Sequence, residues 1–222
     1  MGSVEDYCRR VQLEAAKLPA GPRAALVVNC NPFTIGHQAL IRRAADESAA
    51  VIVFVVTEDK SLFPFSDRIE LVREGTRDLA NVIVVPGEDY IISSATFPAY
   101  FTREEDTVTA QTRLDVTLFA TKLAPQLGIT RRYVGEEPYC AVTDAYNQAM
   151  REILPAHHIE FTVIPRIAAE GEIVSASKVR EMIRQDDWEG VKRMVPETTY
   201  SYLRSEQAKS VIDKIKATHT RH

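Results

Sequence analysis

The sequence predicts an α/β fold in which a doubly wound, parallel sheet of five strands is followed by C-terminal helices. Short apolar runs alternate with segments of helical periodicity over most of the chain. The run at residues 49–57 is rich in β-branched residues and lacks polar alternation, which is typical of a parallel strand covered on both faces. Because parallel neighbours need crossover connections, each strand is expected to pass into a helix before the next strand begins.

The first part of the chain contains the expected first three strands. An amphipathic helix at residues 4–18 ends at a breaker rich in proline and glycine at residues 19–22. In the helix expected after the second strand, Ser66 is a candidate N-cap, and Ile69 and Val72 share an apolar stripe. Strands are expected at residues 24–29, 49–57 and 81–85, and the intervening helices at residues 36–48 and 65–78.

The alternation resumes after an irregular segment at residues 87–108, which is rich in aromatic and polar side chains. A loop of this length in a compact domain is usually functional or contains structure that periodicity does not reveal. Gly128 is expected to end the helix that follows. Helices are expected at residues 110–127 and 142–154, strands at residues 131–134 and 159–164, and further helices at residues 175–184, 187–194 and 198–217.

The length of 222 residues allows one large domain with an extension. We therefore divide the chain into an N-terminal helix and linker at residues 1–22, an α/β domain at residues 23–195 and a C-terminal helical extension at residues 196–222. The chain is 45% hydrophobic and 26% charged, so it can bury a core and is not expected to be disordered.

The charge balance argues against nucleic acid as the main partner. The chain has 31 acidic and 27 basic residues and a formal net charge of −4, whereas phosphate backbones favour a clustered positive surface. A local basic pocket for a small anion is compatible with this balance.

The cysteines and the terminal sequence indicate a cytoplasmic protein with no membrane partner. Cys8, Cys30 and Cys140 are far apart and show no CxxC spacing, so we expect reduced thiols rather than disulfides or a zinc site. No other cluster of ligand residues indicates a metal held by the protein. The first 17 residues are charged, unlike a signal peptide, and the apolar run at residues 49–56 is too short to cross a bilayer.

A polar turn that contains Asn31 and Phe33 joins the first strand to the helix after it. Such a turn directs free backbone N–H groups and the positive end of a helix dipole towards whatever it holds. Thr34 adds a hydroxyl, Gly36 permits close approach, and His37 adds an imidazole donor. We interpret the turn as a cradle for nucleotide phosphates; the alternative is that Thr34 only caps the helix and His37 lies in its first turn.

A second group of polar residues opens the helix expected at residues 175–184. It consists of Ser175, Ser177, Lys178 and Arg180. Capping explains one serine, but cations are disfavoured at a helix N-terminus unless an anion joins them there. The group therefore predicts a second phosphate contact; the alternative is a solvated basic face.

The two patterns together resemble the signatures of the adenylyltransferase (nucleotidyltransferase) superfamily. Residues 34–37 resemble its TxGH/HxGH motif, and residues 175–180 resemble its late SxSxxR-type motif, in the same order along the chain. The resemblance implies a Rossmann-like fold of the HxGH type that binds ATP. It also implies that Thr34 and His37 stabilise the transition state at the α-phosphorus.

By the same resemblance, Ser175, Ser177, Lys178 and Arg180 support the β- and γ-phosphates. We therefore take Thr34, His37, Lys178 and Arg180 as candidate catalytic residues. The candidate nucleotide-binding residues are Asn31, Phe33, Gly36, Lys60, Arg68, Gly135, Ser175 and Ser177.

Three of these residues are assigned to nucleotide binding only because of their positions after predicted strands. Lys60 and Arg68 follow the second strand and are expected to reach phosphate, with a surface ion pair as the alternative for each. Gly135 ends the fourth strand, where close approach of a ribose or adenine favours glycine.

The middle of the chain narrows the resemblance to citrate lyase ligase, a family that acetylates the thiol prosthetic group of citrate lyase at the expense of ATP. The similarity covers about residues 26–184, and the family-specific segments are residues 58–65, 89–98, 135–140 and 142–148. It implies activation of acetate as acetyl-AMP, with ATP and Mg²⁺ as cofactors and the citrate lyase acyl carrier subunit as partner. The family usually has an additional N-terminal domain resembling an acetyltransferase, for which the residues before the first strand are too few.

Two other functions are compatible with the same motifs. One is adenylyl transfer to another small acceptor, such as a phosphopantetheine-like or mononucleotide compound, which gives an adenylylated product instead of AMP and a thioester. The other is a non-catalytic ATP-binding module, which releases no pyrophosphate with any acceptor.

Overall fold

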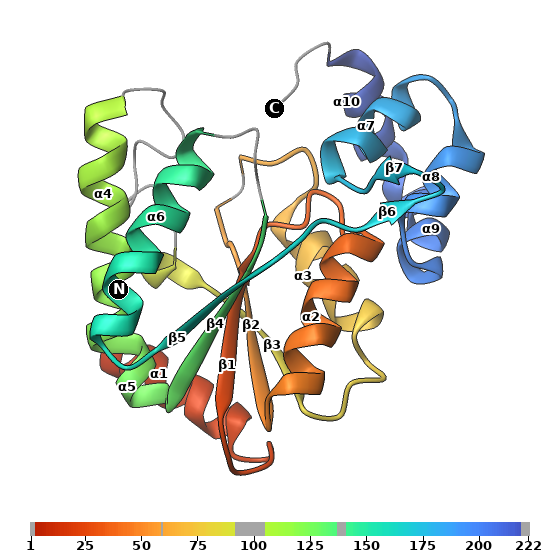
Figure 1. Cartoon of the computed structure of the whole chain (residues 1–222). Coiled ribbons are helices and arrows are strands. Elements are labelled where there is room, and N and C mark those ends of the chain that lie inside the picture. The colour runs from red at the N-terminus through yellow and green to blue at the C-terminus, as the bar shows by residue number, and fades with distance from the viewer. Residues whose placement is uncertain (1–2, 59, 92–104, 137–140, 219–222) are drawn as a thin grey trace.

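Five parallel strands form the centre of the molecule in the order β3-β2-β1-β4-β5 (Figure 1). The structure is a computed structural model that describes residues 3–58, 60–91, 105–136 and 141–218. The strand order reverses between β1 and β4, which confirms the predicted doubly wound α/β sheet. The strands are β1 (Arg23–Val28), β2 (Ala50–Val55), β3 (Val82–Pro86), β4 (Ile129–Gly135) and β5 (Glu160–Ile164).

Helices cover both faces of the sheet, as Figure 1 shows. The central strand β2 is buried at all six positions, which confirms the expectation from its continuous apolar run. One face carries α2 (Ile35–Glu47) and α3 (Phe65–Gly75). The opposite face carries α1 (Val4–Ala15), α4 (Glu105–Leu118), a π-helical turn (Phe119–Leu123), α5 (Ala124–Leu127) and α6 (Ala141–Ala156).

The C-terminal helices form a third apolar core beside the carboxyl end of the sheet (Figure 1). This core also includes Phe63, and the domain boundary expected at residue 195 falls inside it. A short hairpin, β6 (Ala168–Ala169) and β7 (Glu172–Ile173), leads into it. The helices are α7 (Ala176–Arg184), α8 (Trp188–Met194), α9 (Glu197–Leu203) and α10 (Lys209–Ala217).

Two predicted helices are interrupted. The helix expected at residues 198–217 is split into α9, a 3-10 turn (Glu206–Ala208) and α10. At the break, Ser205 has extended backbone angles and its hydroxyl donates to the carbonyl of Tyr202 at 2.7 Å, a side-chain bond that competes with helix continuation. The helix expected at residues 110–127 contains the π-helical turn just before Pro125, whose ring nitrogen cannot donate to the preceding turn.

Other expectations differ at element ends. Helix α3 begins at Phe65 after Pro64, with no side-chain cap, so the expected Ser66 N-cap is wrong. Gly128 ends α5 with left-handed backbone angles, as expected. A 3-10 turn, η1 (Glu88–Tyr90), opens the irregular segment. Residues 92–98 and 137–140, which belong to the segments expected to be family-specific, lie outside the described residues.

Helix α3 packs so closely against the β1–α2 turn that position 75 has no room for a side chain. A Cβ added to Gly75 would lie 2.2 Å from Cε1 of Phe33, whose side chain is fully buried. Protein cores adjust to such overlap only by shifting side chains or backbone.

We therefore expect Gly75→Ala to lower the free energy of unfolding by about 1–3 kcal/mol through overpacking against Phe33. Urea denaturation measures the loss. Gly135→Ala is a matched control because the nearest atom to its added Cβ is 3.7 Å away, an ordinary contact. Equal stabilities of the two variants would contradict the packing argument.

Candidate active site

A cavity of about 550 Å³ lies at the carboxyl ends of β1, β4 and β5, where the strand order reverses. Ligands of doubly wound sheets bind at this position, and the volume is in the range of small-molecule sites. Both predicted motifs contribute to its wall. The lining residues that the following argument uses are Thr34, Gly36, His37, Gly135, Glu136, Arg166, Ser175, Ser177 and Lys178.

Thr34 caps helix α2 and also holds the imidazole of His37. Its hydroxyl accepts from the backbone N–H of His37 at 3.4 Å, and its own N–H donates to Nδ1 of His37 at 3.1 Å. The hydroxyl lies 2.9 Å from the same Nδ1. The capping alternative is therefore correct for Thr34, and the same geometry orients the histidine towards the cavity that it lines.

These contacts fix the protonation state of His37. A backbone N–H can only donate, so Nδ1 is the acceptor and the ring proton of the neutral imidazole is on Nε2. Burial, and next the positive charge of Arg166, lower the pKa of His37 to about 4. The side chain is therefore a neutral hydrogen-bond donor at pH 7. The ring of Phe33 stacks against it with centroids 5.9 Å apart.

Asn31 and Phe33 shape the turn without lining the cavity. The side-chain carbonyl of Asn31 accepts from the N–H of Phe63 at 3.1 Å, and Phe33 is fully buried in the core beneath α2. Neither residue is among those that line the cavity, and their contact with the nucleotide stays a prediction. Phe33 instead stacks against the ring of His37, and Asn31 binds the backbone of Phe63.

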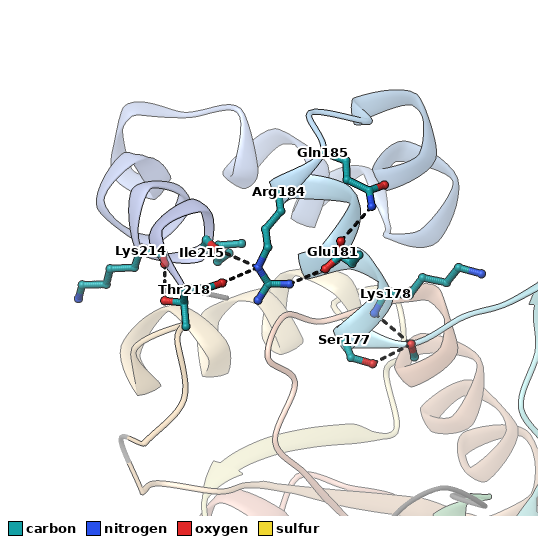
Figure 2. A network of polar contacts seen from close by, with 9 residues as sticks. Ser177, Lys178, Glu181, Arg184, Gln185, Lys214, Ile215 and Thr218 are labelled. Atoms are coloured by element: carbon teal, nitrogen blue, oxygen red, sulfur yellow. Dashed lines mark hydrogen bonds and ion pairs between the residues drawn. The ribbon is translucent and has the colours of Figure 1, made fainter. Parts of the chain in front are cut away.

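The N-terminus of α7 also contributes to the cavity wall, and Figure 2 shows its polar contacts. The hydroxyl of Ser175 caps the helix by accepting from the N–H of Lys178 at 3.2 Å, and it lies 3.2 Å from the hydroxyl of Ser177. The ammonium of Lys178 is 3.2 Å from a carboxylate oxygen of Glu172 on β7. Two hydroxyls, free backbone amides and one ammonium therefore face the same space, a combination that suits phosphate.

Arg180 is not among the residues that line the cavity, but its guanidinium joins the two motifs. Its Nη1 donates to the backbone carbonyl of Asn31 at 2.5 Å, whereas its buried Nε has no hydrogen-bond partner. Burial, and next the charge of Arg184, lower the pKa of Arg180 to about 10, so it remains protonated at pH 7. A buried cation with an unused donor beside the cavity fits an anionic ligand such as a triphosphate.

The structure places two other predicted binding residues away from the cavity wall. Arg68 is fully buried, and its guanidinium donates to backbone carbonyls of the loops after β1 and β2, at 2.8–3.0 Å. It holds these loops and does not face the cavity. Lys60 lies on the surface, 3.9 Å from Glu58. Gly135 does line the cavity, and the close approach of a ribose or adenine to it stays a prediction.

Sequence reasoning missed Arg166, which also lines the cavity. This side chain follows β5, and its Nε donates to the carbonyl of Glu136 after β4 at 2.9 Å. Its position directly beyond the carboxyl end of a parallel strand was a usable signal. Arg166 adds a second cation to the residues that line the cavity.

Arg184 on α7 links this helix to the end of α10, the last helix of the chain (Figure 2). Its Nε donates to the carbonyls of Ile215 and Thr218 at the end of α10, at 3.1 and 2.8 Å, and its Nη1 donates to Glu181 at 2.9 Å. A cation at a helix C-terminus is stabilising because it meets the negative end of the dipole. The C-terminal helix thereby supports the cavity wall.

We expect Arg184→Met to destabilise the docking of α10 by about 1–3 kcal/mol, because carbonyls at the helix end lose their partner. Faster hydrogen exchange of α10 amides would report the loss. Arg193→Met is the control, since its ion pair with Glu170 is exposed and worth little. Equal protection of α10 in both variants would refute the tether.

The imidazole of His37 should titrate near pH 4 and carry its proton on Nε2 at neutral pH. Since the unfolded value is about 6.5, the unfolded chain binds more protons between these values, and stability falls as the pH drops from about 6.5 towards 4. ¹⁵N NMR of labelled histidine, assigned with His37→Gln, measures both properties. An ordinary pKa or an Nδ1–H tautomer would contradict the geometry.

No helix within the described ranges is both long and apolar enough to cross a bilayer. Those ranges also hold no group of three His, Cys, Asp or Glu side chains placed to bind a metal ion.

Solved structures share the fold. TmcAL of Thermotoga maritima, bound with alpha-thio ATP, has a TM-score of 0.52 at 17% identity, over 85% of this chain and 56% of that chain. A bifunctional NMN adenylyltransferase/ADP ribose pyrophosphatase of Francisella tularensis has a TM-score of 0.54 at 15% identity, over 89% of this chain and 52% of that chain. At these identities the likeness concerns the fold alone.

Sequence relatives are closer. The chain is 43% identical over 202 residues to the citrate (pro-3S)-lyase ligase of Klebsiella pneumoniae and 40% identical over 199 residues to that of Escherichia coli (strain K12). The alignments cover 89% and 87% of this chain but 58% and 56% of the relatives, so the chain spans little more than half of their length. The profile of the citrate lyase ligase C-terminal domain matches residues 23–203. The chain therefore belongs to the citrate lyase ligase family, in the region of its C-terminal domain.

Proposed function

We propose that this chain is an ATP-dependent ligase that activates acetate as acetyl-AMP and transfers the acetyl group to the thiol prosthetic group of the citrate lyase acyl carrier subunit. One observation carries the proposal: the turn with Thr34 and His37 and the helix start with Ser175 and Lys178 line one cavity. Membership of the citrate lyase ligase family supports the choice of acid and carrier. The buried free thiols of Cys8 and Cys30 are compatible with the cytoplasm as the site of the reaction.

In the first step, a carboxylate oxygen of acetate attacks the α-phosphorus of ATP, and pyrophosphate leaves. Acetate is already ionised at pH 7, because carboxyl groups have pKa values near ~4, so no general base is needed. The barrier comes from aligning two anions and stabilising the charge that develops. His37 suits this task as a neutral Nε2–H donor to an α-phosphate oxygen, fixed in place by Thr34.

Positive charge must then come from other groups, since His37 carries none at pH 7. Lys178 and Arg166 line the cavity, and Arg180 binds the turn that contains Asn31. The amides and hydroxyls at the start of α7 support the assignment of this segment to the β- and γ-phosphates. Mg²⁺ would supply further neutralisation of these phosphates, held mainly by phosphate oxygens rather than by a protein cage.

In the second step, the thiol of the carrier attacks the acetyl carbonyl, which gives a thioester and AMP. A free thiol has a pKa of about 8.5, so some thiolate is present at pH 7. Cys30 is not a candidate nucleophile, because it is fully buried and burial raises the pKa of its thiol. The products distinguish this function from the alternatives: adenylyl transfer to another acceptor gives no AMP, and a binding module releases no pyrophosphate.

We expect His37→Ala to lower the rate of acetate-dependent ATP–pyrophosphate exchange by about 10²–10³-fold, the usual cost of one well-placed donor to the reacting centre. Thermal unfolding should stay cooperative, since the side chain is only partly buried. His157→Ala is the matched control, because His157 is exposed at the far end of α6 and should leave exchange unchanged. Wild-type exchange by the His37→Ala variant would remove His37 from the mechanism.

A further inference from the structure

Three arginines in the described chain are almost completely buried, and they differ in how their donors are used. The exposed fractions are 0% for Arg68, 3% for Arg132 and 7% for Arg180. Arg68 makes five hydrogen bonds, to the carbonyls of four residues and a side-chain amide oxygen. It shows how this fold satisfies an arginine whose role is structural.

Arg132 is not satisfied in this way. Its Nε is buried without a hydrogen-bond partner, and no hydrogen bond from the rest of its guanidinium is found within the described residues. The guanidinium lies over the ring of Phe119, 4.5 Å from the centroid. Burial lowers the pKa of Arg132, yet arginine stays protonated, so the protein holds an incompletely compensated cation.

The surroundings of Arg132 form a polar cluster inside an otherwise apolar layer. Asp115 on α4 and Tyr146 on α6 both influence the guanidinium electrostatically, and both are buried. The hydroxyl of Tyr146 donates to the carboxylate of Asp115, so that carboxylate is already engaged. Phe119 and Val116 supply apolar neighbours to the same layer.

The position of Arg132 relates the cluster to the nucleotide cavity. Arg132 is on β4, opposite Ala25 of β1, on the sheet face covered by α4 and α6. Three residues further along β4, Gly135 lines the cavity. The strand order reverses between β1 and β4, where doubly wound folds open a crevice at the carboxyl edge.

We propose that Arg132 binds the carboxylate of the small monocarboxylic acid that the nucleotide site activates. The proposal rests on the proposed function. A guanidinium offers two parallel donors that match a carboxylate. A monoanion fits better than a phosphate dianion because the charge of Asp115 is close by, and Phe119 and Val116 suit a methyl group.

The test removes the charge of Arg132 with a side chain of similar length. Arg132→Met should raise the KM for acetate in ATP–pyrophosphate exchange by roughly 100-fold and leave the KM for ATP unchanged, since a buried charged partner is lost from the acid alone. Its melting temperature should fall less than that of Arg68→Met, because Arg132 makes no hydrogen bond within the described residues whereas Arg68 makes several. Arg132→Lys, which keeps the charge but not the fork, should recover part of the affinity for acetate.

Two variants serve as controls. Arg131→Met changes the neighbouring residue, whose guanidinium pairs with Glu160 at 3.2 Å, and should keep the wild-type KM for acetate. Arg68→Met removes a structural arginine and should lower the melting temperature. Acetate should raise the melting temperature of the wild type and of Arg131→Met, but not that of Arg132→Met.

Each other outcome has a defined meaning. An unchanged KM for acetate in Arg132→Met, or a melting temperature as low as that of Arg68→Met, would overturn the proposal while leaving the ligase function standing. Stabilisation by inorganic phosphate alone, lost in Arg132→Met, would overturn the carboxylate assignment. Absence of exchange with any acid in the wild type would instead reject the ligase function. In that case the acetate site at Arg132 would stand only if acetate raised the melting temperature of the wild type but not that of Arg132→Met.

Discussion

The contact between the start of α7 and the β1–α2 turn is the constraint on which the site depends. Arg180 donates to the carbonyl of Asn31, a residue 149 positions earlier in the chain, and a Cβ on Gly36 would meet Val174 at 3.5 Å. The apolar core of the C-terminal helices and the contacts of Arg184 hold α7 against α10 and its neighbours. The C-terminal helices therefore contribute to the cavity even though few of their residues line it.

The polar groups of the proposed nucleotide site differ in charge: His37 is neutral, whereas Lys178 and Arg180 are cations. His37 is neutral and directional, because Thr34 fixes its tautomer and burial keeps it unprotonated. The cations, by contrast, are already partly compensated within the protein: Lys178 by Glu172 and Arg180 by a carbonyl. Binding of a triphosphate would exchange these internal partners for phosphate oxygens, so a highly charged ligand could bind without leaving bare cations in the free protein.

Local patterns predicted most of the fold and part of the site. The apolar run of β2, the stop at Gly128 and the caps at Thr34 and Ser175 are set by neighbours in sequence, and the structure has all of them. What sequence reasoning missed depends on partners far along the chain. Arg68 was expected to reach phosphate but lies beneath the loops, and Arg166 was overlooked because only the folded sheet brings the end of β5 beside β4.

The central claim is that both motifs bind the triphosphate of one ATP molecule, and a crystal structure with a non-hydrolysable ATP analogue tests it most directly. The account predicts an α-phosphate oxygen at about 2.7–3.2 Å from Nε2 of His37, with the terminal phosphates at the N–H groups that begin α7. A triphosphate that contacts only one of the two segments, or lies outside the cavity between them, would contradict it.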